Sequence, residues 1–373
     1  EAIILVGGVH MTALPIETMR MSPELDIGVI GEGDETITEL LNVLEGGGDL
    51  SQVKGLVFRR NGNLVVTEDR PPLKELDKLP MPAWDMLPDL KNYFRGPTYC
   101  LDKLPMGLLI TSRGCPSHCN FCDRSVTGNV FRAHSAHYVM QMIREQYHKY
   151  GIRGVHIIDS NFILNKKRVR DICTLLKEEK LDFSWSCLAR VNLVTPEILG
   201  LMKEAGCWRI DYGLESGSQG VLNTINKGIT LEQSKQAVKW AKEAGLRVRG
   251  FFMLGNPTDT PETIRQTIDF AKSLDIDMFH FTFYSCFPGS TIYKDIRAYG
   301  EYKENWEEMS LWKPTFIPRG MTEEELLRFQ KLGFREFYLR PKVIINFLRF
   351  IRRPRHILFL FYGLMGFLQQ LFK

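Results

Sequence analysis

The strongest constraint on the fold is a regular alternation of strand-like and helix-like segments between residues 107 and 285. The chain is expected to form six short strands there, at 107–112, 154–159, 183–188, 208–216, 246–254 and 277–285. Helical periodicity fills most of the intervals, at 135–149, 166–179, 196–205, 218–244 with a break at Gly228, and 261–273. Strands joined by helical crossovers form a parallel sheet whose functional loops follow the carboxyl ends of the strands. The pattern predicts an α/β fold with an incomplete (β/α)6 barrel of the TIM type.

The rest of the chain divides into further segments. Residues 1–50 contain two strand–helix pairs: "AIILVGG" is interpreted as a buried strand, "ALPIETMRM" as a helix, "DIGVIGEG" as a strand and "DETITELLNVLEGG" as a helix. Residues 51–104 begin with a hairpin around Asn61-Gly62 and continue as a proline-rich linker. The barrel is placed at 105–300, a helical extension at 301–340 and a basic amphipathic tail at 341–373.

Three cysteines crowd the loop after the first barrel strand. The stretch "SRGCPSHCNFCDRS" holds Cys115, Cys119 and Cys122 within eight residues. Thiolates are soft ligands that suit iron–sulfur clusters or zinc. His118 could complete a closed zinc site, whereas three cysteines alone would leave one iron of a [4Fe–4S] cluster open to a small molecule. On spacing alone, a cluster, a zinc site and unliganded thiols all remain possible.

The other cysteines do not indicate a disulfide framework. Eight cysteines in 373 residues are too few for one, and no secretory leader is visible, so a reducing, cytoplasmic location is expected. The strand residues His156 and His280 are expected to be packed side chains. Most aromatic residues lie in strands or in the tail, which argues against a nucleic-acid partner. Small buried core positions are expected for the other five cysteines: Cys100, Cys173, Cys187, Cys207 and Cys286.

"CPSHCNFC" at the start of a parallel βα series resembles the signature of the radical S-adenosylmethionine (SAM) superfamily. The resemblance extends over residues 105–290, because further motifs of that superfamily follow in order. It implies that Cys115, Cys119 and Cys122 bind three irons of a [4Fe–4S] cluster. The fourth iron would bind the methionine moiety of SAM, and Phe121 would lie near the adenine.

Two later segments resemble the SAM-contacting motifs of the same superfamily. In "GLESGSQ" (213–219), the resemblance assigns Glu215 and Ser216 to the ribose and methionine of SAM. The alternative is a polar strand end in front of a helix, since serine is a good N-cap. In "GFFMLGNPTDT" (250–260), Gly255 would allow the backbone to pass close to the adenine. Pro257-Thr258 replaces the Pro-Gly that the superfamily often has, so this loop departs from the superfamily pattern.

One further motif resembles a cobalamin-dependent branch of the superfamily, and another resembles the end of the superfamily's barrel. "IIDSNFILN" (157–165) would direct Asp159, Ser160 and Asn161 toward the active site, and "CFPGSTIY" (286–293) resembles the close of the sixth strand, with Ser290 in place of Thr. Tyr99, Tyr212 and Tyr284 are candidates for contact with substrate.

The N-terminal residues resemble the last third of a Rossmann-like cobalamin-binding domain. Gly7 and Gly8 match the glycine pair beside the nucleotide tail of cobalamin, and Gly31, Glu32 and Gly33 match a following "GEG" turn. A generic βα turn could also contain such a glycine pair. The first part of that domain is expected upstream of residue 1, so this chain alone is expected to bind cobalamin poorly.

The tail differs in charge from the rest of the chain. From Phe337 to Lys373 there are seven Lys or Arg residues and no Asp or Glu, whereas the whole chain has a net charge of +4. Basic residues beside bulky apolar ones favour a helix lying in a membrane interface, on the inner face of the membrane. The alternative is a helix that covers the open side of the barrel.

These resemblances together imply a radical SAM enzyme. Reductive cleavage of SAM at a [4Fe–4S] cluster would yield a radical that attacks an unactivated carbon, leading to methyl transfer or oxidative cyclisation. The full-length protein is expected to use cobalamin, to receive electrons from a flavodoxin or ferredoxin, and to act on a small molecule such as a lipid or tetrapyrrole. The alternative from another class is a cobalamin- or zinc-binding module without catalysis.

Overall fold

The computed structural model describes residues 2–89 and 102–349, together with residues 357 and 365. It divides the chain into two compact units. The first contains residues 1–79, 113–133 and 286–296, and the second contains 80–112, 134–285 and 297–373. The cysteine loop therefore belongs to the same unit as the N-terminal residues. Cys100, Tyr99 and most of the tail lie outside the described residues.

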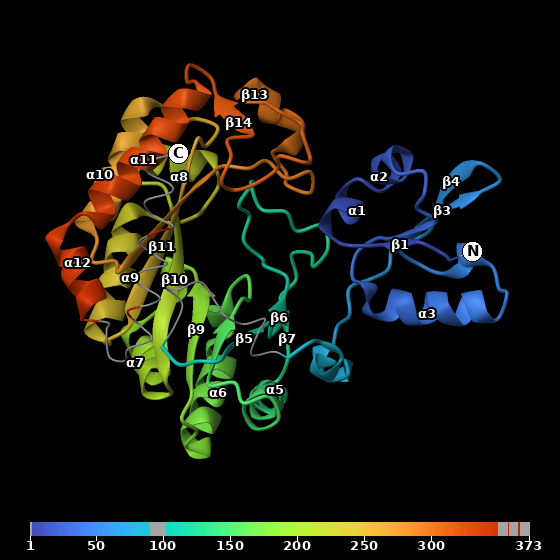
Figure 1. Cartoon of the computed structure of the whole chain (residues 1–373), viewed down its shortest axis with the longest axis horizontal. Coiled ribbons are helices and arrows are strands. Elements are labelled where there is room, and N and C mark those ends of the chain that lie inside the picture. The colour runs from blue at the N-terminus through green and yellow to red at the C-terminus, as the bar shows by residue number, and fades with distance from the viewer. Residues whose placement is uncertain (1, 90–101, 350–356, 358–364, 366–373) are drawn as a thin grey trace. The chain divides into compact units, whose positions relative to one another are not determined.

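The first unit is built on a four-stranded sheet of order β1-β2-β3-β4 (Figure 1). β1 (Leu5–Val6) and β2 (Ile27–Val29) are parallel, and β3 (Leu56–Arg60) and β4 (Asn63–Val66) continue the sheet antiparallel. The predicted hairpin is confirmed, because Asn61 and Gly62 both have positive φ between β3 and β4. The helices of this unit are α1 (Val9–Ala13), α2 (Pro15–Met21) and α3 (Gly33–Glu45).

One N-terminal expectation was largely confirmed and one was wrong. The helix expected from "ALPIETMRM" is α2, which begins two residues later than expected, because Leu14 before Pro15 has a φ of −134° and is not helical. The short helix α1 was not predicted. The strand expected to be buried in "AIILVGG" is only two residues long, and Ile3 and Ile4 are 51% and 45% exposed.

The sheet of the first unit has an apolar cluster on each face. Leu56 and Phe58 pack with Leu40 of α3 on one face. The intervening Val57 packs with Met11 of α1 and Met19 of α2 on the other. This division follows from the alternation of side chains along a strand. The sheet is thus covered on both faces.

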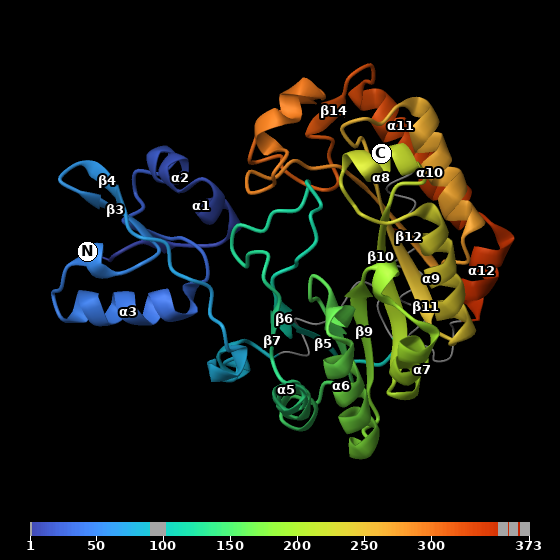
Figure 2. The same ribbon diagram turned by 180° about the vertical axis from the view of Figure 1, so that it is seen from behind.

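The second unit contains a curled six-stranded parallel sheet, and its strand order is β12-β11-β10-β9-β8-β5 (Figures 1 and 2). All neighbouring strands in it are parallel. This is the predicted partial TIM-like barrel, and each strand lies within three residues of its predicted bounds. The strands are β5 (Met106–Leu109), β8 (Gly154–Ile157), β9 (Ser184–Ala189), β10 (Cys207–Glu215), β11 (Arg247–Leu254) and β12 (Met278–Phe283).

Most helices of the second unit begin at side-chain caps. Ser135, Asn165 and Thr195 each accept a hydrogen bond from the backbone N–H three residues on. Positive φ at Asn226 and Gly228 separates α8 from α9, which confirms the predicted break. The helices are α5 (Ala136–His148), α6 (Lys166–Glu179), α7 (Pro196–Glu204), α8 (Gln219–Thr224), α9 (Leu231–Glu243), α10 (Pro261–Ser273), α11 (Glu323–Tyr338) and α12 (Pro341–Leu348).

The two faces of the barrel sheet differ in polarity. The face covered by helices is apolar: Phe279 of β12 stacks on Phe337 of α11 with ring centroids 4.9 Å apart. Alternate residues on the opposite face are largely polar, and many of them are buried. They include His156, Ser186, Arg209, Asp211 and Arg249.

Smaller elements complete the described structure. β13 (Gly300–Tyr302) and β14 (Phe316–Pro318) pair antiparallel, and β6 (Ser112–Arg113) pairs with β7 (Arg132–Ala133). Within the described residues, no helix is long and apolar enough to cross a membrane. Short 3-10 turns lie at Leu50–Gln52, Leu76–Lys78, Trp84–Met86, Phe162–Leu164, Val191–Leu193 and Tyr293–Ala298.

Candidate active site

The cysteine loop closes on itself through backbone hydrogen bonds. The N–H of Cys115 donates to the carbonyl of Gly128, and that of Cys122 donates to the carbonyl of Cys119, both at 3.4 Å. Gly114 is required here, because its φ is +77° and an added Cβ would lie 2.1 Å from the Val130 oxygen. Cys119 is buried, Cys115 half-buried and Cys122 exposed. The Cys119–Cys122 turn places two of the three cysteines on adjacent parts of one loop.

The donor set of this loop suits an iron–sulfur cluster. Three thiols on one short, tightly turned segment are the ligands that such clusters use. Among the described residues, no group of three or more His, Cys, Asp or Glu side chains stands close enough together to hold a metal ion. The assignment of Cys115, Cys119 and Cys122 as ligands therefore stays a prediction.

Residues 286–296 pack against the cysteine loop within the first unit. The carbonyl of Asn120 accepts a hydrogen bond from the N–H of Ile292 at 3.2 Å. Gly289 has no room for a side chain, because an added Cβ would lie 2.1 Å from a carboxylate oxygen of Asp123. The Pro-Gly-Ser segment recognised in the sequence thus supports the loop that carries the cysteines. Phe121, expected near the adenine, is half-buried in this loop.

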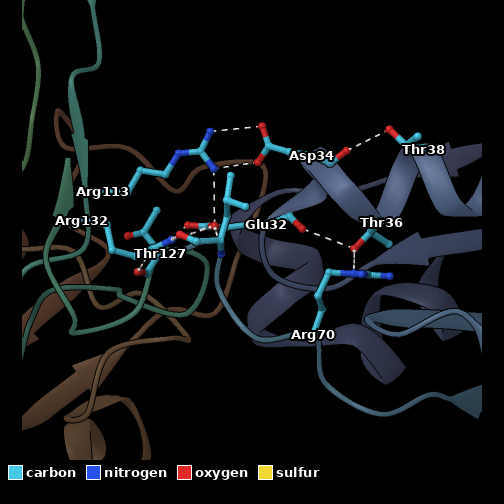
Figure 3. A network of polar contacts seen from close by, with 9 residues as sticks. Glu32, Asp34, Thr36, Thr38, Arg70, Arg113, Thr127 and Arg132 are labelled. Carbon is cyan, nitrogen blue, oxygen red and sulfur yellow. Dashed lines mark hydrogen bonds and ion pairs between the residues drawn. The ribbon is translucent and has the colours of Figure 1, made fainter. Parts of the chain in front are cut away.

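Two arginines at the ends of the cysteine loop bind the carboxylates of Glu32, which precedes α3, and Asp34, which lies in its first turn (Figure 3). Arg132 forms a bidentate ion pair with Glu32, with N–O distances of 2.7 and 2.9 Å. Arg113 forms another with Asp34, at 2.6 and 3.2 Å. The Arg113 hydrogen bonds and charge lower the pKa of Asp34. The "GEG" turn therefore contacts the cysteine loop, a contact that the sequence did not predict.

The glycine pair expected near cobalamin lies at the start of α1. Gly7 and Gly8 are exposed, and Gly8 has a φ of +104° that favours glycine. An added Cβ at Gly8 would meet no atom within 4 Å. The open surface is compatible with a ligand, but α1 has only five residues and its N-terminus alone does not define a site.

In the barrel unit, the carboxylate of Asp159 binds Thr111 and Ser112, which follow the first barrel strand. Its Oδ1 accepts hydrogen bonds from the N–H groups of Thr111 and Ser112 at 2.5 and 3.0 Å. Its Oδ2 accepts from both hydroxyls at 2.6 and 2.7 Å. Four hydrogen bonds fix the chain just before the cysteine loop. The structure thus gives Asp159 a supporting position, whereas the sequence suggested that it faces the active site.

Asn161 lies four residues after the end of β8, and its side-chain amide forms no hydrogen bond within the described structure. The residue is 1% exposed, and neither Nδ2 nor Oδ1 has a hydrogen-bond partner among the residues that the structure describes. Leaving both groups of a buried amide unsatisfied is costly. Asn161 therefore fits the description of a residue that binds a ligand, while the neighbouring Ser160 is exposed.

Glu215 ends β10 in an unusual conformation and forms a buried ion pair. Its φ is +61°, and its Oε1 lies 2.5 Å from Nζ of Lys227. Both side chains are about one-tenth exposed, with values of 10% and 8%. Gly213 leaves space for this pair, because an added Cβ would lie 2.5 Å from the carboxylate and 2.8 Å from the ammonium. Strained residues of this kind concentrate at functional sites.

Lys227 was missed by the sequence interpretation. It lies 12 residues beyond Glu215, and only the chain reversal after α8 brings the two together. The other predicted residue of the motif has a supporting contact, since the Ser216 hydroxyl lies 3.1 Å from that of Thr267 on α10. Gly255 has a φ of +76°, which accounts for glycine at that position.

A buried cluster of charges lies on the inner face of the barrel sheet. Asp211 forms an ion pair with Arg209 at 2.8 Å and another with Arg249. Burial opposes ionisation of Asp211, but the two guanidinium groups lower its pKa overall. His156 lies 3.6 Å from Asp211 and 2.9 Å from the Ser186 hydroxyl. Burial lowers the pKa of His156 to about 4, so this side chain is neutral at pH 7.

The other sequence-predicted residues are mostly buried. The core positions expected for Cys173, Cys187, Cys207 and Cys286 are confirmed. The packed role expected for His280 is confirmed by its stacking on Phe251, at a centroid distance of 5.0 Å. Tyr212 is fully buried on the face of β10 that packs against helices, which does not favour contact with substrate. Tyr284 is also buried and packs against Phe316.

The protein-family model described as the radical SAM superfamily matches residues 109–271. An uncharacterized methyltransferase of Pyrococcus horikoshii is 38% identical over 345 residues, covering 92% of this chain and 74% of the relative. An anaerobic magnesium-protoporphyrin IX monomethyl ester cyclase of Cereibacter sphaeroides is 25% identical, covering 91% of this chain and 56% of the relative. The solved cobalamin-dependent SAM radical enzyme OxsB is similar in fold, with a TM-score of 0.72 at 18% identity, covering 99% of this chain and 59% of the other.

Proposed function

The chain belongs to the radical SAM superfamily, and from this premise we propose that its full-length protein modifies an unactivated carbon of a small molecule. The observation that carries the proposal is the cysteine loop, with three thiols on one tightly turned segment after the first barrel strand. A [4Fe–4S] cluster with bound SAM would supply a 5′-deoxyadenosyl radical for hydrogen abstraction. Cys115, Cys119 and Cys122 would hold that cluster.

The carboxyl ends of the barrel strands carry the groups proposed to bind SAM. Glu215 and Lys227 form a buried pair of opposite charges, which is complementary to the ammonium and carboxylate of a methionine moiety. Asn161 offers a buried amide with both polar groups available. These side chains would orient SAM, and their burial would exclude water from it. Ser216 and Gly255 would shape the adjacent backbone, and Phe121 would lie beside the adenine.

The first unit is proposed to be part of a cobalamin-binding domain. Gly8 leaves an open backbone surface at the start of α1, and Gly7 beside it is exposed. The likeness to OxsB covers almost the whole chain, first unit included, and supports a common fold. Bound cobalamin would supply a transferable methyl group, with a flavodoxin or ferredoxin as the electron source.

Methyl transfer is favoured over cyclisation by one observation. The relative that is 38% identical is named a methyltransferase, whereas the cyclases are 25% identical. A tetrapyrrole or lipid substrate is supported by relatives named for bacteriochlorophyllide and hopanoid methylation, which are 25% and 26% identical.

Anaerobic reconstitution of the 373-residue chain with iron and sulfide tests this proposal. The expected product binds about four irons, absorbs broadly near 400 nm and has a paramagnetic resonance signal after reduction that changes when SAM is added. Bound zinc without iron would support the alternative of a non-catalytic module. An iron-loaded protein whose signal ignores SAM would contradict the proposed SAM site.

Replacing Glu215 by Gln is expected to weaken SAM binding by about 10- to 100-fold. Charge-assisted hydrogen bonds contribute ~1.5–3 kcal/mol, and ~1.4 kcal/mol corresponds to one decade of affinity. The measurement is a SAM titration followed through the signal of the reconstituted cluster. Glu197→Gln is the matched control, because Glu197 is exposed and pairs with Arg170 on the barrel surface. Equal affinities for the two variants would leave Glu215 as a polar strand end.

We also propose a peripheral membrane contact through the tail, on the cytoplasmic face. The described part of the tail, α12, buries Val343 but exposes Ile344, Ile345 and Leu348. Deleting residues 341–373 removes six basic residues, each contributing ~1 kcal/mol near an anionic surface. We expect at least ~10-fold weaker binding to phosphatidylcholine vesicles that contain phosphatidylserine, measured by sedimentation at moderate salt. Unchanged binding would favour the alternative that the tail covers the barrel.

A further inference from the structure

The carboxylates of Glu32, in the "GEG" turn, and Asp34, in the first turn of α3, lie against the two ends of the cysteine loop. Arg113 immediately precedes Gly114-Cys115, and Arg132 follows the loop in β7. Figure 3 shows both guanidinium groups pointing toward the turn, where Arg113 meets Asp34 and Arg132 meets Glu32. Arg113 also lies 3.5 Å from Glu32, so the two ion pairs form one network.

The Glu32–Arg132 pair is buried, and both side chains form further hydrogen bonds to the backbone. Both side chains are only 7% exposed. Arg132 also donates to the carbonyls of Thr127 and Leu73, at 2.7 and 2.8 Å. Glu32 accepts a further hydrogen bond from the N–H of Leu73 at 3.1 Å. A buried bidentate pair with these extra bonds fixes the geometry of both partners more firmly than a surface ion pair does.

The turn itself is held by hydrogen bonds to α1. The N–H of Gly31 donates to the Thr12 hydroxyl at 3.0 Å, and that hydroxyl donates to the carbonyl of Gly8 at 2.8 Å. Glu32 thus stands on a backbone that is hydrogen-bonded to α1. It is not a side chain extended into solvent.

We propose that Glu32, supported by Asp34, is a positioning residue for the metal cluster: it clamps the loop of residues 113–133 so that its cysteines are held in one arrangement. The identity of the cluster rests on the proposed function, whereas the clamp rests on the ion pairs alone. In this role Glu32 acts on the loop through Arg132. The clamp also joins the sheet that carries the glycine pair to the loop that carries the thiols.

The test compares Glu32→Gln with Glu39→Gln in the full chain. Glu39 is the matched control, because it lies on α3 and pairs with Arg70 outside the cysteine loop. Amide hydrogen exchange of the metal-free protein is expected to be at least ~10-fold faster at residues 113–133 in Glu32→Gln and unchanged in Glu39→Gln. After reconstitution, Glu32→Gln should lose iron faster during dialysis and show an altered resonance spectrum of the reduced cluster.

Further variants separate a clamp from general destabilisation. Arg132→Lys keeps the charge but loses the bidentate geometry, so it should also raise exchange at residues 113–133. If Glu32→Gln does not fold, Asp34→Asn tests the Arg113–Asp34 ion pair instead. Asp34 is 31% exposed, so its substitution is expected to destabilise the fold less. Exchange that rises equally over the whole sheet, or identical loop exchange in Glu32→Gln and Glu39→Gln, would overturn the proposal. Failure of the unmodified chain to form a cluster would contradict the proposed function. The exchange experiment on the metal-free protein would still test the clamp.

Discussion

Replacing any one of Cys115, Cys119 and Cys122 by Ala is expected to prevent assembly of a stable iron–sulfur cluster. Each thiolate would hold a different iron, so loss of one leaves a second iron without a protein ligand. Iron and sulfide analysis after anaerobic reconstitution measures the effect, together with absorption near 400 nm. We expect each variant to retain less than about one-tenth of the cluster content of the parent chain.

Cys173→Ala is the control for this experiment. Cys173 is buried in α6, and burial raises the pKa of its thiol to about 12, so it remains protonated at pH 7 and is a poor metal ligand. The Ala variant should bind as much iron as the parent. Equal iron content in all four variants would show that the three loop cysteines are not the ligands.

The barrel could be predicted from the sequence because its signals are local and repeated. Every predicted barrel strand recurs in the structure, and α6 and α10 have the predicted bounds, 166–179 and 261–273. The strands carry apolar side chains on the face that packs against helices, and most of the helices between them start at side-chain caps. The N-terminal unit was harder to predict, because β1 has only two residues and α1 only five, which is too short for a periodic pattern.

The candidate site could be predicted only in part. The three cysteines and Glu215 belong to short motifs, and such motifs are visible without a structure. Lys227 is brought to Glu215 by a chain reversal, and Arg132 reaches Glu32 across 100 residues, so no spacing rule indicates either pair. Asp159 was correctly placed at a strand end, but nothing in its motif indicates the four hydrogen bonds to Thr111 and Ser112 that occupy its oxygens.

Replacing Asp211 by Asn is expected to cause a large loss of stability. Asp211 lies in the charged cluster on the inner face of the barrel sheet. Asp211 is fully buried between the guanidinium groups of Arg209 and Arg249. Asp211→Asn preserves the shape but removes the negative charge that both arginines face. Breaking a buried ion pair by removing one partner costs ~3–5 kcal/mol, so we expect a loss of this size in the free energy of unfolding, measured by urea denaturation.

The pH dependence of this loss provides a second check. The arginines hold the folded pKa of Asp211 below its ordinary value of 3.8. A carboxyl group with a lowered folded pKa stabilises the protein above its unfolded pKa, and this contribution is lost as pH falls through the folded pKa. The difference in unfolding free energy between Asp211→Asn and the parent should therefore be constant from about pH 5 to 8 and shrink only below about pH 4.

The control is Asp269→Asn, because Asp269 is 56% exposed beside Arg265 and such pairs contribute about 0–1 kcal/mol. If the two variants lose the same stability, the cluster on the inner face of the barrel does not depend on the Asp211 charge.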